Sequence, residues 1–396
     1  VYGGPPLRSR EAVFWKVRVW DEDGKATAYS TVASFEMALL HGHDWQADWI
    51  GWPGGRPGRA VYLRCGIDLP GLPSRARLYI TALGFYEVFV NGVFPGGRLQ
   101  PAVTDTGRRI LYHVHDVTGC LSAGKNFLAA VVGNGWHGRP SLLCQLEADY
   151  EDGRRLIFCS GCHPGQPTWF AAGGPVRENS IFDGESYDAR LEEAGWACVA
   201  DGGGQNGPRG KLWMPACVVP GPAGVLRAQR VEAVSVVRSL PPAAETEPRP
   251  GVRVFDFGTN HSGWAGLSVL GQEGTAVRMK YAELLHADGT VSQENLRTAA
   301  AEDCYILQGA ATVESWEPRF TYHGYRYVQV EGDPSLPAKC HVVSRVARSG
   351  LARRGSFACS HALLNRIHEM VVGTEEANLH GIPTDCPQRD ERMGWL

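Results

Sequence analysis

The stretch 75–97, RARLYITALGFYEVFVNGVFPGG, decides the fold. It holds two runs rich in apolar, β-branched and aromatic residues, a composition typical of strands. Asn91-Gly92 lies between apolar runs and is a strong signal for a tight hairpin turn, because both residue types tolerate positive φ. The stretch therefore predicts two strands and a hairpin turn within a β-domain.

The same pattern continues on both sides of this stretch. Strand-like runs follow at 108–121 and 125–136, and further ones, each bounded by glycine or charged turns, fill 233–345. The 49 glycines and 25 prolines, about a fifth of the 396 residues, are spread among these short runs without a fixed period. This composition favours many strands joined by tight turns, so we predict a mainly β protein built of tandem β-sandwiches.

The two ends of the chain differ from this pattern. At 15–20 apolar and basic residues alternate, and the turn sequence Asp-Glu-Asp-Gly follows at 21–24, which predicts a strand of a small sandwich. Near 355 the period becomes helical, with apolar residues from Leu363 to Val371 and Ser360 as a candidate N-cap. Because the chain starts at Val1 without a leader and stops inside the helical part, we expect both ends to be cut.

Composition excludes several classes of protein. The 39 Lys and Arg residues nearly balance 42 Asp and Glu, which argues against a nucleic-acid partner. No run approaches the roughly 18 apolar residues of a membrane span. The eleven cysteines are scattered and odd in number, which indicates a reduced, cytoplasmic protein. The CxxCH pattern at 159–163 has no second ligand pair at zinc spacing, so we expect no metal and no cofactor.

The densest group of chemically useful residues is the segment 381–396, GIPTDCPQRDERMGWL. Pro387 suits the first turn of a helix, with Asp385 just outside its positive end. On that helix Gln388, Glu391 and Trp395 would share one face, and an indole beside a carboxyl raises its pKa as a general acid requires. The alternative is a purely structural role, in which acidic residues in the first turn of a helix interact favourably with the helix dipole and an arginine bridges them.

A second candidate is the stretch 316–328, WEPRFTYHGYRYV. As a strand it would place Phe320 and Tyr322 on one face, with Arg319, Thr321 and His323 on the other, and Gly324 marks a bulge or a close backbone approach. His323 could line a sugar site, although a hydrogen-bonded packing role is the more common one.

A third candidate is 181–190, IFDGESYDAR, with four charged residues around glycine and tyrosine. Asp183, Glu185, Asp188 and Arg190 could bind a metal ion or a sugar. A turn held by Asp–Arg pairing is the simpler interpretation.

The segment 384–395, TDCPQRDERMGW, closely resembles the signature of bacterial α-L-rhamnosidases of glycoside hydrolase family 78. Further segments resemble the same family in the same order, namely 15–21, 83–92, 131–136, 183–190, 255–264, 282–297 and 317–327. The resemblance implies four units: an immunoglobulin-like remnant at 1–40, a jelly-roll-like β-sandwich with linkers at 41–232, a second, concanavalin-like β-sandwich at 233–345, and the first helices of an (α/α)6 catalytic barrel at 346–396.

The resemblance also implies inverting hydrolysis of terminal α-L-rhamnosides, with a rhamnose-containing glycoside or polysaccharide as the partner. Position by position, the family's general acid falls on Glu391, and Asp385, Arg389 and Trp395 fall on residues that line the rhamnose subsite. The general base belongs to a later part of the barrel, so we expect no turnover from residues 1–396 alone. Gly96-Gly97 stands where an acidic residue is common, so neither a calcium site nor a secondary sugar site is carried over.

Two alternatives remain open at this point. The chain could be a non-catalytic array of carbohydrate-binding β-sandwiches whose helical tail serves as an interface. It could also belong to a related (α/α)6 glycosidase that acts on another deoxy-sugar. The sequence indicates neither the aglycone and linkage preference nor the oligomeric state.

Overall fold

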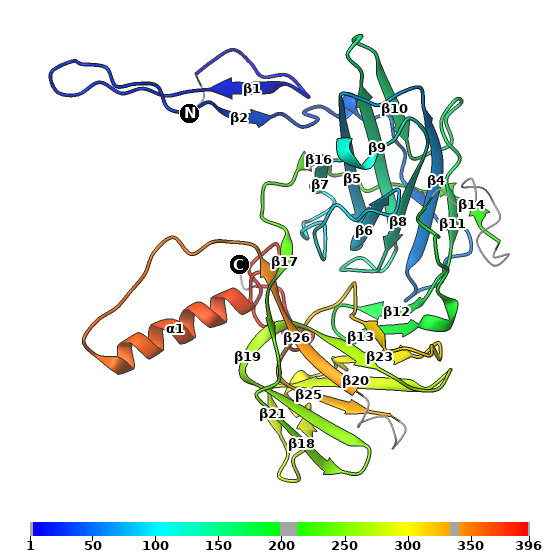
Figure 1. Ribbon diagram of the computed structural model, residues 1–396, viewed down its shortest axis with the longest axis vertical. Coiled ribbons are helices and arrows are strands. Elements are labelled where there is room, and N and C mark those ends of the chain that lie inside the picture. The colour runs from blue at the N-terminus through cyan, green and yellow to red at the C-terminus, as the bar shows by residue number, and fades with distance from the viewer. Residues whose placement is uncertain (1–2, 199–211, 333–339, 395–396) are drawn as a thin grey trace.

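The computed structural model describes residues 3–198, 212–332 and 340–394. Within these residues the strands form two large β units, stacked one above the other in Figure 1, and the α-helix α1 (Ala362–Ala377) follows them. The prediction of a mainly β fold is confirmed.

The first unit is a sandwich of two sheets whose facing apolar side chains form one core. Its larger sheet has the order β15 (Cys217–Val218), β3 (Ile50–Gly51), β9 (Ser141–Asp149), β5 (Arg75–Leu83), β7 (Arg109–Asp116) and β16 (Val225–Ala228), with β10 (Arg155–Cys159) beside β9. The smaller sheet has the order β14 (Met214–Pro215), β11 (Phe170–Ala172), β4 (Val61–Leu69), β8 (Gly124–Val132) and β6 (Tyr86–Val90).

The stretch 75–97 forms the two predicted strands, and they lie in opposite sheets. The chain crosses between the sheets at Gly84, whose φ is +115° and whose added Cβ would lie 1.9 Å from the carbonyl oxygen of Gly133. Only glycine fits this position. The hairpin turn is confirmed: Asn91 and Gly92 have φ of 51° and 81°, and Val90 and Val93 exchange both backbone hydrogen bonds.

The second unit is built around one large sheet. Its order is β12 (Val176–Ser180), β13 (Gly184–Asp188), β23 (Glu302–Ile306), β20 (Ala276–Ala282), β25 (His323–Glu331), β19 (Val252–Val269), β26 (Cys340–Ser349) and β17 (Val234–Leu240), and both β18 (Ala244–Arg249) and β24 (Glu314–Trp316) pair with β19. A small hairpin of β21 (Leu284–Leu285) and β22 (Val291–Ser292) accompanies it.

The two units are interlocked by the path of the chain. Strands β12 and β13 leave the first unit and join the edge of the large sheet, where β13 pairs in parallel with β23. The chain then returns to the first unit through β14, β15 and β16 before it forms the rest of the large sheet. Short 3-10 helices lie at η1 (Gly42–Asp44), η2 (Thr118–Cys120), η3 (Ala189–Leu191) and η6 (Glu294–Leu296).

The N-terminal part extends away from the first unit (Figure 1). Its two strands, β1 (Ala12–Trp15) and β2 (Ala33–Glu36), pair in antiparallel fashion. The first strand therefore lies at Ala12–Trp15, earlier in the sequence than the strand predicted at 15–20. The turn at 21–24 is confirmed, with the Gly24 N–H bonded to the carbonyl oxygen of Asp21 at 3.0 Å.

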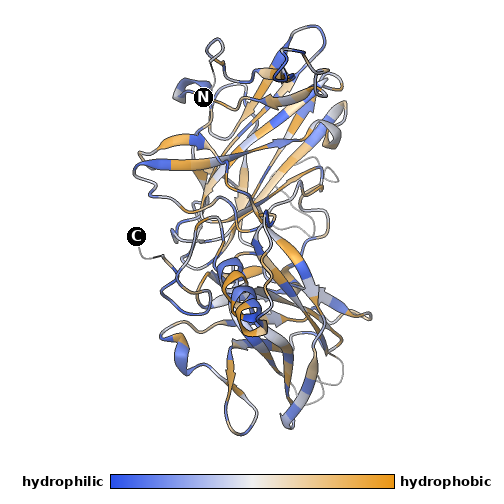
Figure 2. Cartoon of the chain, turned by 90° about the vertical axis from the view of Figure 1, so that its left-hand side faces the viewer, coloured by the Kyte–Doolittle hydropathy of each residue, from blue (hydrophilic) through white to orange (hydrophobic). Residues whose placement is uncertain are grey.

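Helix α1 confirms the predicted change from strand-like to helical spacing of apolar residues near residue 355. Its N-cap is His361 rather than Ser360, because the side chain of Asn365 bonds both the N–H and the carbonyl oxygen of Cys359 and holds the preceding residues outside the helix. The apolar residues of the predicted stripe are between 42% and 60% exposed, namely Leu363, Leu364, Ile367, Met370 and Val371. Figure 2 shows hydrophobic and hydrophilic positions side by side on the helix.

Candidate active site

The segment 378–394 leaves helix α1 and folds back on itself. Thr384 donates its N–H to the carbonyl oxygen of Asn378 at 2.8 Å, and Asp385 donates to the carbonyl oxygen of Arg392 at 2.9 Å. Thr384 and Met393 also form an isolated β-bridge. The segment is therefore a closed loop, called the 378–394 loop below, and it carries most of the predicted site residues.

The helix predicted to start at Pro387 is not formed, so that prediction is wrong. Arg392 has a φ of +34°, a conformation that no residue inside an α-helix adopts, and its carbonyl oxygen is used by Asp385. Gln388 and Glu391 consequently do not share a helix face. Trp395, the fourth predicted site residue, lies outside the described residues.

Aromatic stacking attaches the 378–394 loop to the second β unit. The ring of His380 stacks on Tyr322 with centroids 3.9 Å apart, and its Nε2 lies 3.1 Å from the carbonyl oxygen of Ala347 in β26. The Arg392 guanidinium lies 4.2 Å from the Tyr322 ring and 5.4 Å from the Phe182 ring. Burial lowers the pKa of His380 to about 3, so this ring is a neutral packing group. The stretches 181–190 and 316–328, both singled out in the sequence, therefore meet the 378–394 loop at one point.

Gly324 permits this docking. A Cβ on Gly324 would lie 2.6 Å from Cγ of Pro387 and 3.0 Å from the backbone nitrogen of Gln388. The expectation of a close backbone approach at this glycine is confirmed, and the approaching chain is the 378–394 loop itself.

Three of the predicted site residues lie together on the 378–394 loop. Nη2 of Arg389 is 3.5 Å from Oδ2 of Asp385 and 2.9 Å from Oε2 of Glu391. All three side chains are half-buried, between 24% and 34% exposed. A guanidinium between two carboxylates can donate to sugar hydroxyls while the carboxylates accept from them, and a carboxyl can transfer a proton.

The sequence reasoning missed two further contacts to this group. Nη1 of Arg297 lies 2.9 Å from Oε2 of Glu391, and its Nε lies 3.1 Å from Oδ1 of Asp390. The Thr298 hydroxyl donates to Asp390, and this bond and the nearby Arg297 charge lower the pKa of the Asp390 carboxyl. Arg297 and Thr298 follow η6 in the second unit, so no spacing in the sequence could have joined them to the 378–394 loop.

The remaining candidates have structural roles. His323 is fully buried, stacks on Tyr281 at 4.0 Å and places Nε2 3.3 Å from Oδ2 of Asp303, which confirms the packing interpretation. Arg319 pairs with Glu87 of β6 and so joins the two units. Asp188 binds Arg190 through both carboxylate oxygens at 2.8 and 2.9 Å, as the simpler interpretation predicts.

Glu185 is the most perturbed carboxyl of the 181–190 stretch. Its Oε2 accepts the backbone N–H groups of Arg319 and Phe320 at 3.1 and 3.0 Å. Burial raises the pKa of Glu185 to about 8. Asp183 accepts the backbone N–H of Ala300 at 3.1 Å. Among residues 3–198, 212–332 and 340–394, no group of three or more His, Cys, Asp or Glu could hold a metal ion.

Comparison with known protein families covers most of the chain. Residues 1–41 match the family described as Rha78A-like, N-terminal immunoglobulin domain, and residues 71–238 match the α-L-rhamnosidase N-terminal domain. Residues 246–348 match the bacterial α-L-rhamnosidase concanavalin-like domain, and residues 352–396 match the bacterial α-L-rhamnosidase six-hairpin glycosidase domain.

Individual relatives agree with these matches. An α-L-rhamnosidase of Formosa agariphila is 36% identical over all of this chain and 44% of its own length, and one of Streptomyces avermitilis is 40% identical over 81% of this chain and 32% of its own. The structure of an α-L-rhamnosidase from Dictyoglumus thermophilum superimposes with a TM-score of 0.92 at 35% identity, covering all of this chain and 46% of that one.

The structure of Streptomyces avermitilis α-L-rhamnosidase complexed with L-rhamnose superimposes with a TM-score of 0.85 at 28% identity, covering all of this chain and 55% of that one. The chain thus spans roughly a third to just over half of the length of these relatives. In the described part of the chain, no helix is long and apolar enough to cross a membrane.

Proposed function

Because this chain belongs to the bacterial α-L-rhamnosidase family, we propose that the protein hydrolyses terminal α-L-rhamnosyl residues of glycosides or polysaccharides with inversion. The observation that carries the proposal is the contact of one guanidinium, that of Arg389, with both Asp385 and Glu391. The resemblance of the segment 384–395 implies that these residues belong to the rhamnose subsite and include the general acid.

Glu391 is the proposed general acid. Both arginine contacts, from Arg297 and Arg389, are made to Oε2. Among the described residues no hydrogen bond is made to Oε1, so this oxygen is the atom proposed to carry the proton to the glycosidic oxygen. The guanidinium groups orient the carboxyl group, and a positioned acid of this kind typically contributes about 10²–10⁴-fold to the rate.

Asp385 and Arg389 are the proposed hydroxyl-binding residues. A carboxylate can accept hydrogen bonds from adjacent hydroxyls, and the planar guanidinium can donate two at once. Trp395 remains a proposed apolar wall of the same subsite. Inversion also requires a base on a water molecule, about 6.5–9.5 Å from the acid, and we propose that a later part of the six-hairpin domain supplies it.

The proposal extends to the organisation and location of the protein. We propose the division into units at 1–40, 41–232, 233–345 and 346–396, which is supported by the family matches at similar positions. A cytoplasmic location is proposed because all eleven cysteines are free thiols, three of them exposed.

The test is hydrolysis of a methyl α-L-rhamnoside by protein expressed from the complete coding sequence, followed by proton NMR. We expect the β-anomer of L-rhamnose as the first product. Release of the α-anomer first would contradict inversion, and hydrolysis of another deoxy-sugar in place of rhamnose would contradict the proposed substrate.

A further inference from the structure

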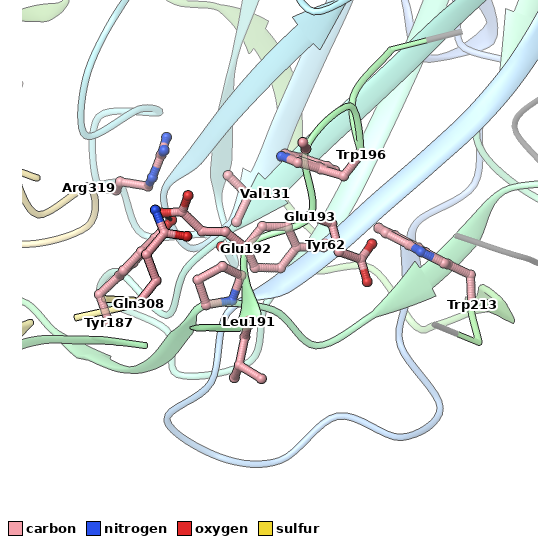
Figure 3. A pocket seen from close by; sticks show the side chains of 12 residues that line it. Tyr62, Val131, Tyr187, Leu191, Glu192, Glu193, Trp196, Trp213, Gln308 and Arg319 are labelled. Atoms are coloured by element: carbon pink, nitrogen blue, oxygen red, sulfur yellow. Dashed lines mark hydrogen bonds between the residues drawn. The ribbon is translucent and has the colours of Figure 1, made fainter. Parts of the chain in front are cut away.

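A cavity of about 370 Å³ lies at the junction of the two β units (Figure 3). Its wall includes Tyr62 of β4, Tyr187 of β13 and Trp196 of the segment after η3. No residue of the 378–394 loop is among the described residues that line it. The cavity is therefore a separate place on the molecule from the candidate active site.

Aromatic rings form one side of this cavity. Tyr62 and Trp196 meet edge to face at 5.0 Å, and Trp196 stacks against Trp213 at 6.4 Å. Tyr62 and Trp213 are buried, whereas Trp196 is only half-buried. The negative face of an aromatic ring attracts weakly positive C–H groups such as those of a sugar ring. Trp196 is therefore the ring that the apolar face of a pyranose could contact, and the two buried rings hold it in place.

Polar side chains complete the wall. Glu192 accepts the Tyr187 hydroxyl at 2.8 Å through Oε1, and Gln308 is exposed at the cavity. Arg319 is held by the Glu87 carboxylate, whose charge raises the pKa of its guanidinium. The cavity thus presents a carboxylate, an amide and a fixed guanidinium, which together both accept and donate hydrogen bonds.

We propose that this cavity is a second, non-catalytic binding site for one sugar residue of a glycan. Its volume lies at the small end of the range typical of ligand pockets, roughly 300–1,000 Å³. The sugar ring would lie against Trp196, and its hydroxyls would bond Glu192, Gln308 and Arg319. The choice of a rhamnose-containing glycan as ligand rests on the function proposed above.

The position of the cavity fits a role in holding the same glycan as the active site. The turn that precedes β13 contacts the 378–394 loop through Phe182, and the far end of β13 supplies Tyr187 to the cavity. Tyr187 follows Phe182 by five residues, so at 3.3 Å per residue these two positions are at most about 16 Å apart. A branched or multi-residue glycan can span such a distance.

The test is calorimetric titration of the 396-residue chain with methyl α-L-rhamnoside, and with methyl glycosides of glucose, galactose and mannose as comparison sugars. Trp196→Ala should weaken binding about 10-fold or more, since aromatic anchors dominate such sites, and Gln308→Ala should weaken it several-fold. Trp20→Ala, which removes an exposed tryptophan elsewhere, and Glu178→Gln, which alters an exposed glutamate on β12, should change nothing.

The outcomes separate the cavity from the active site. Binding that is lost in Asp385→Ala but kept in Trp196→Ala and Gln308→Ala would place the sugar on the 378–394 loop and overturn the second site. Absence of binding by every sugar of the panel would overturn it as well. If Trp196→Ala does not fold, as judged by circular dichroism, the exposed Gln308→Ala variant decides the question. Hydrolysis by protein from the complete coding sequence tests the proposed function independently of these results.

Discussion

Arg297 and Glu391 are 94 residues apart in sequence, yet Nη1 of Arg297 lies 2.9 Å from Oε2 of Glu391. Arg297 holds this position in an unusual backbone conformation, with φ 59° and ψ −112°. Strained backbone of this kind concentrates at functional sites. The second β unit therefore contributes directly to the arrangement of the proposed general acid.

Replacing Arg297 with alanine is expected to lower hydrolysis by protein from the complete coding sequence. The change removes the ion pairs to Glu391 and Asp390, and a misplaced acid can lose up to about 100-fold in rate. The measurement is kcat for an alkyl α-L-rhamnoside. Arg278→Ala is the matched control, because Arg278 is equally exposed and pairs with Glu302 in the same unit. Equal effects of the two changes would argue against a positioning role for Arg297.

Gly324→Ala is expected to displace the 378–394 loop. The added methyl group would meet Pro387 at 2.6 Å, and overpacking of this kind costs about 1–3 kcal/mol. We expect a lower free energy of unfolding in urea, together with a loss of activity. Gly373→Ala serves as the control, since this helical glycine has open space around its added Cβ and alanine favours the helix. Unchanged stability and activity in Gly324→Ala would show that the loop does not dock here.

Stability is expected to depend on the ionisation of Glu185. Burial raises its folded-state pKa from 4.5 to about 8, so the folded protein binds this proton more tightly than the unfolded chain. The free energy of unfolding should therefore fall as the pH rises from about 4.5 to about 8. Glu185→Gln should remove that part of the pH dependence and stabilise the protein at pH 8 by about 1 kcal/mol or more.

Urea unfolding of the unmodified chain and of the Glu185→Gln variant between pH 5 and pH 8 measures this pH dependence of the free energy of unfolding. Glu178→Gln on the neighbouring strand is the control, because Glu178 is exposed and its replacement should leave the pH dependence unaltered. Identical pH dependence in the Glu185→Gln variant and the unmodified chain would contradict the assignment.

The 396-residue chain by itself is expected to show no turnover. It spans 44% of the Formosa agariphila relative, and inversion needs a base in addition to Glu391. The measurement is release of 4-nitrophenol from its α-L-rhamnoside, compared with a Glu391→Gln chain. Hydrolysis above that control would show that these residues already contain both carboxyl groups.

Much of the fold was predictable from local sequence. The Asn91-Gly92 turn, the strands of both units and the period of helix α1 each depend on residues close together in the chain. The helix from Pro387 was mispredicted because Arg392 contacts the Tyr322 ring and accepts the Asp385 N–H, and local sequence reveals neither contact. There tertiary packing determines the backbone.

The candidate site was predictable only in part. Asp385, Arg389 and Glu391 were identified because they lie within seven residues of one another in a recognisable segment. Arg297 was not, since its approach to Glu391 depends on how the second unit meets the 378–394 loop. The cavity beside Trp196 was equally invisible, because its wall is assembled from several separate elements of both units.

The most direct test of Glu391 as general acid compares leaving groups in the Glu391→Gln variant of protein from the complete coding sequence. An alkyl leaving group needs protonation, so kcat for methyl α-L-rhamnoside should fall by about 10²–10⁴-fold. A 2,4-dinitrophenyl leaving group needs little protonation, so its hydrolysis should fall far less. Equal losses for both substrates, or no loss for either, would contradict the assignment of Glu391 as the acid.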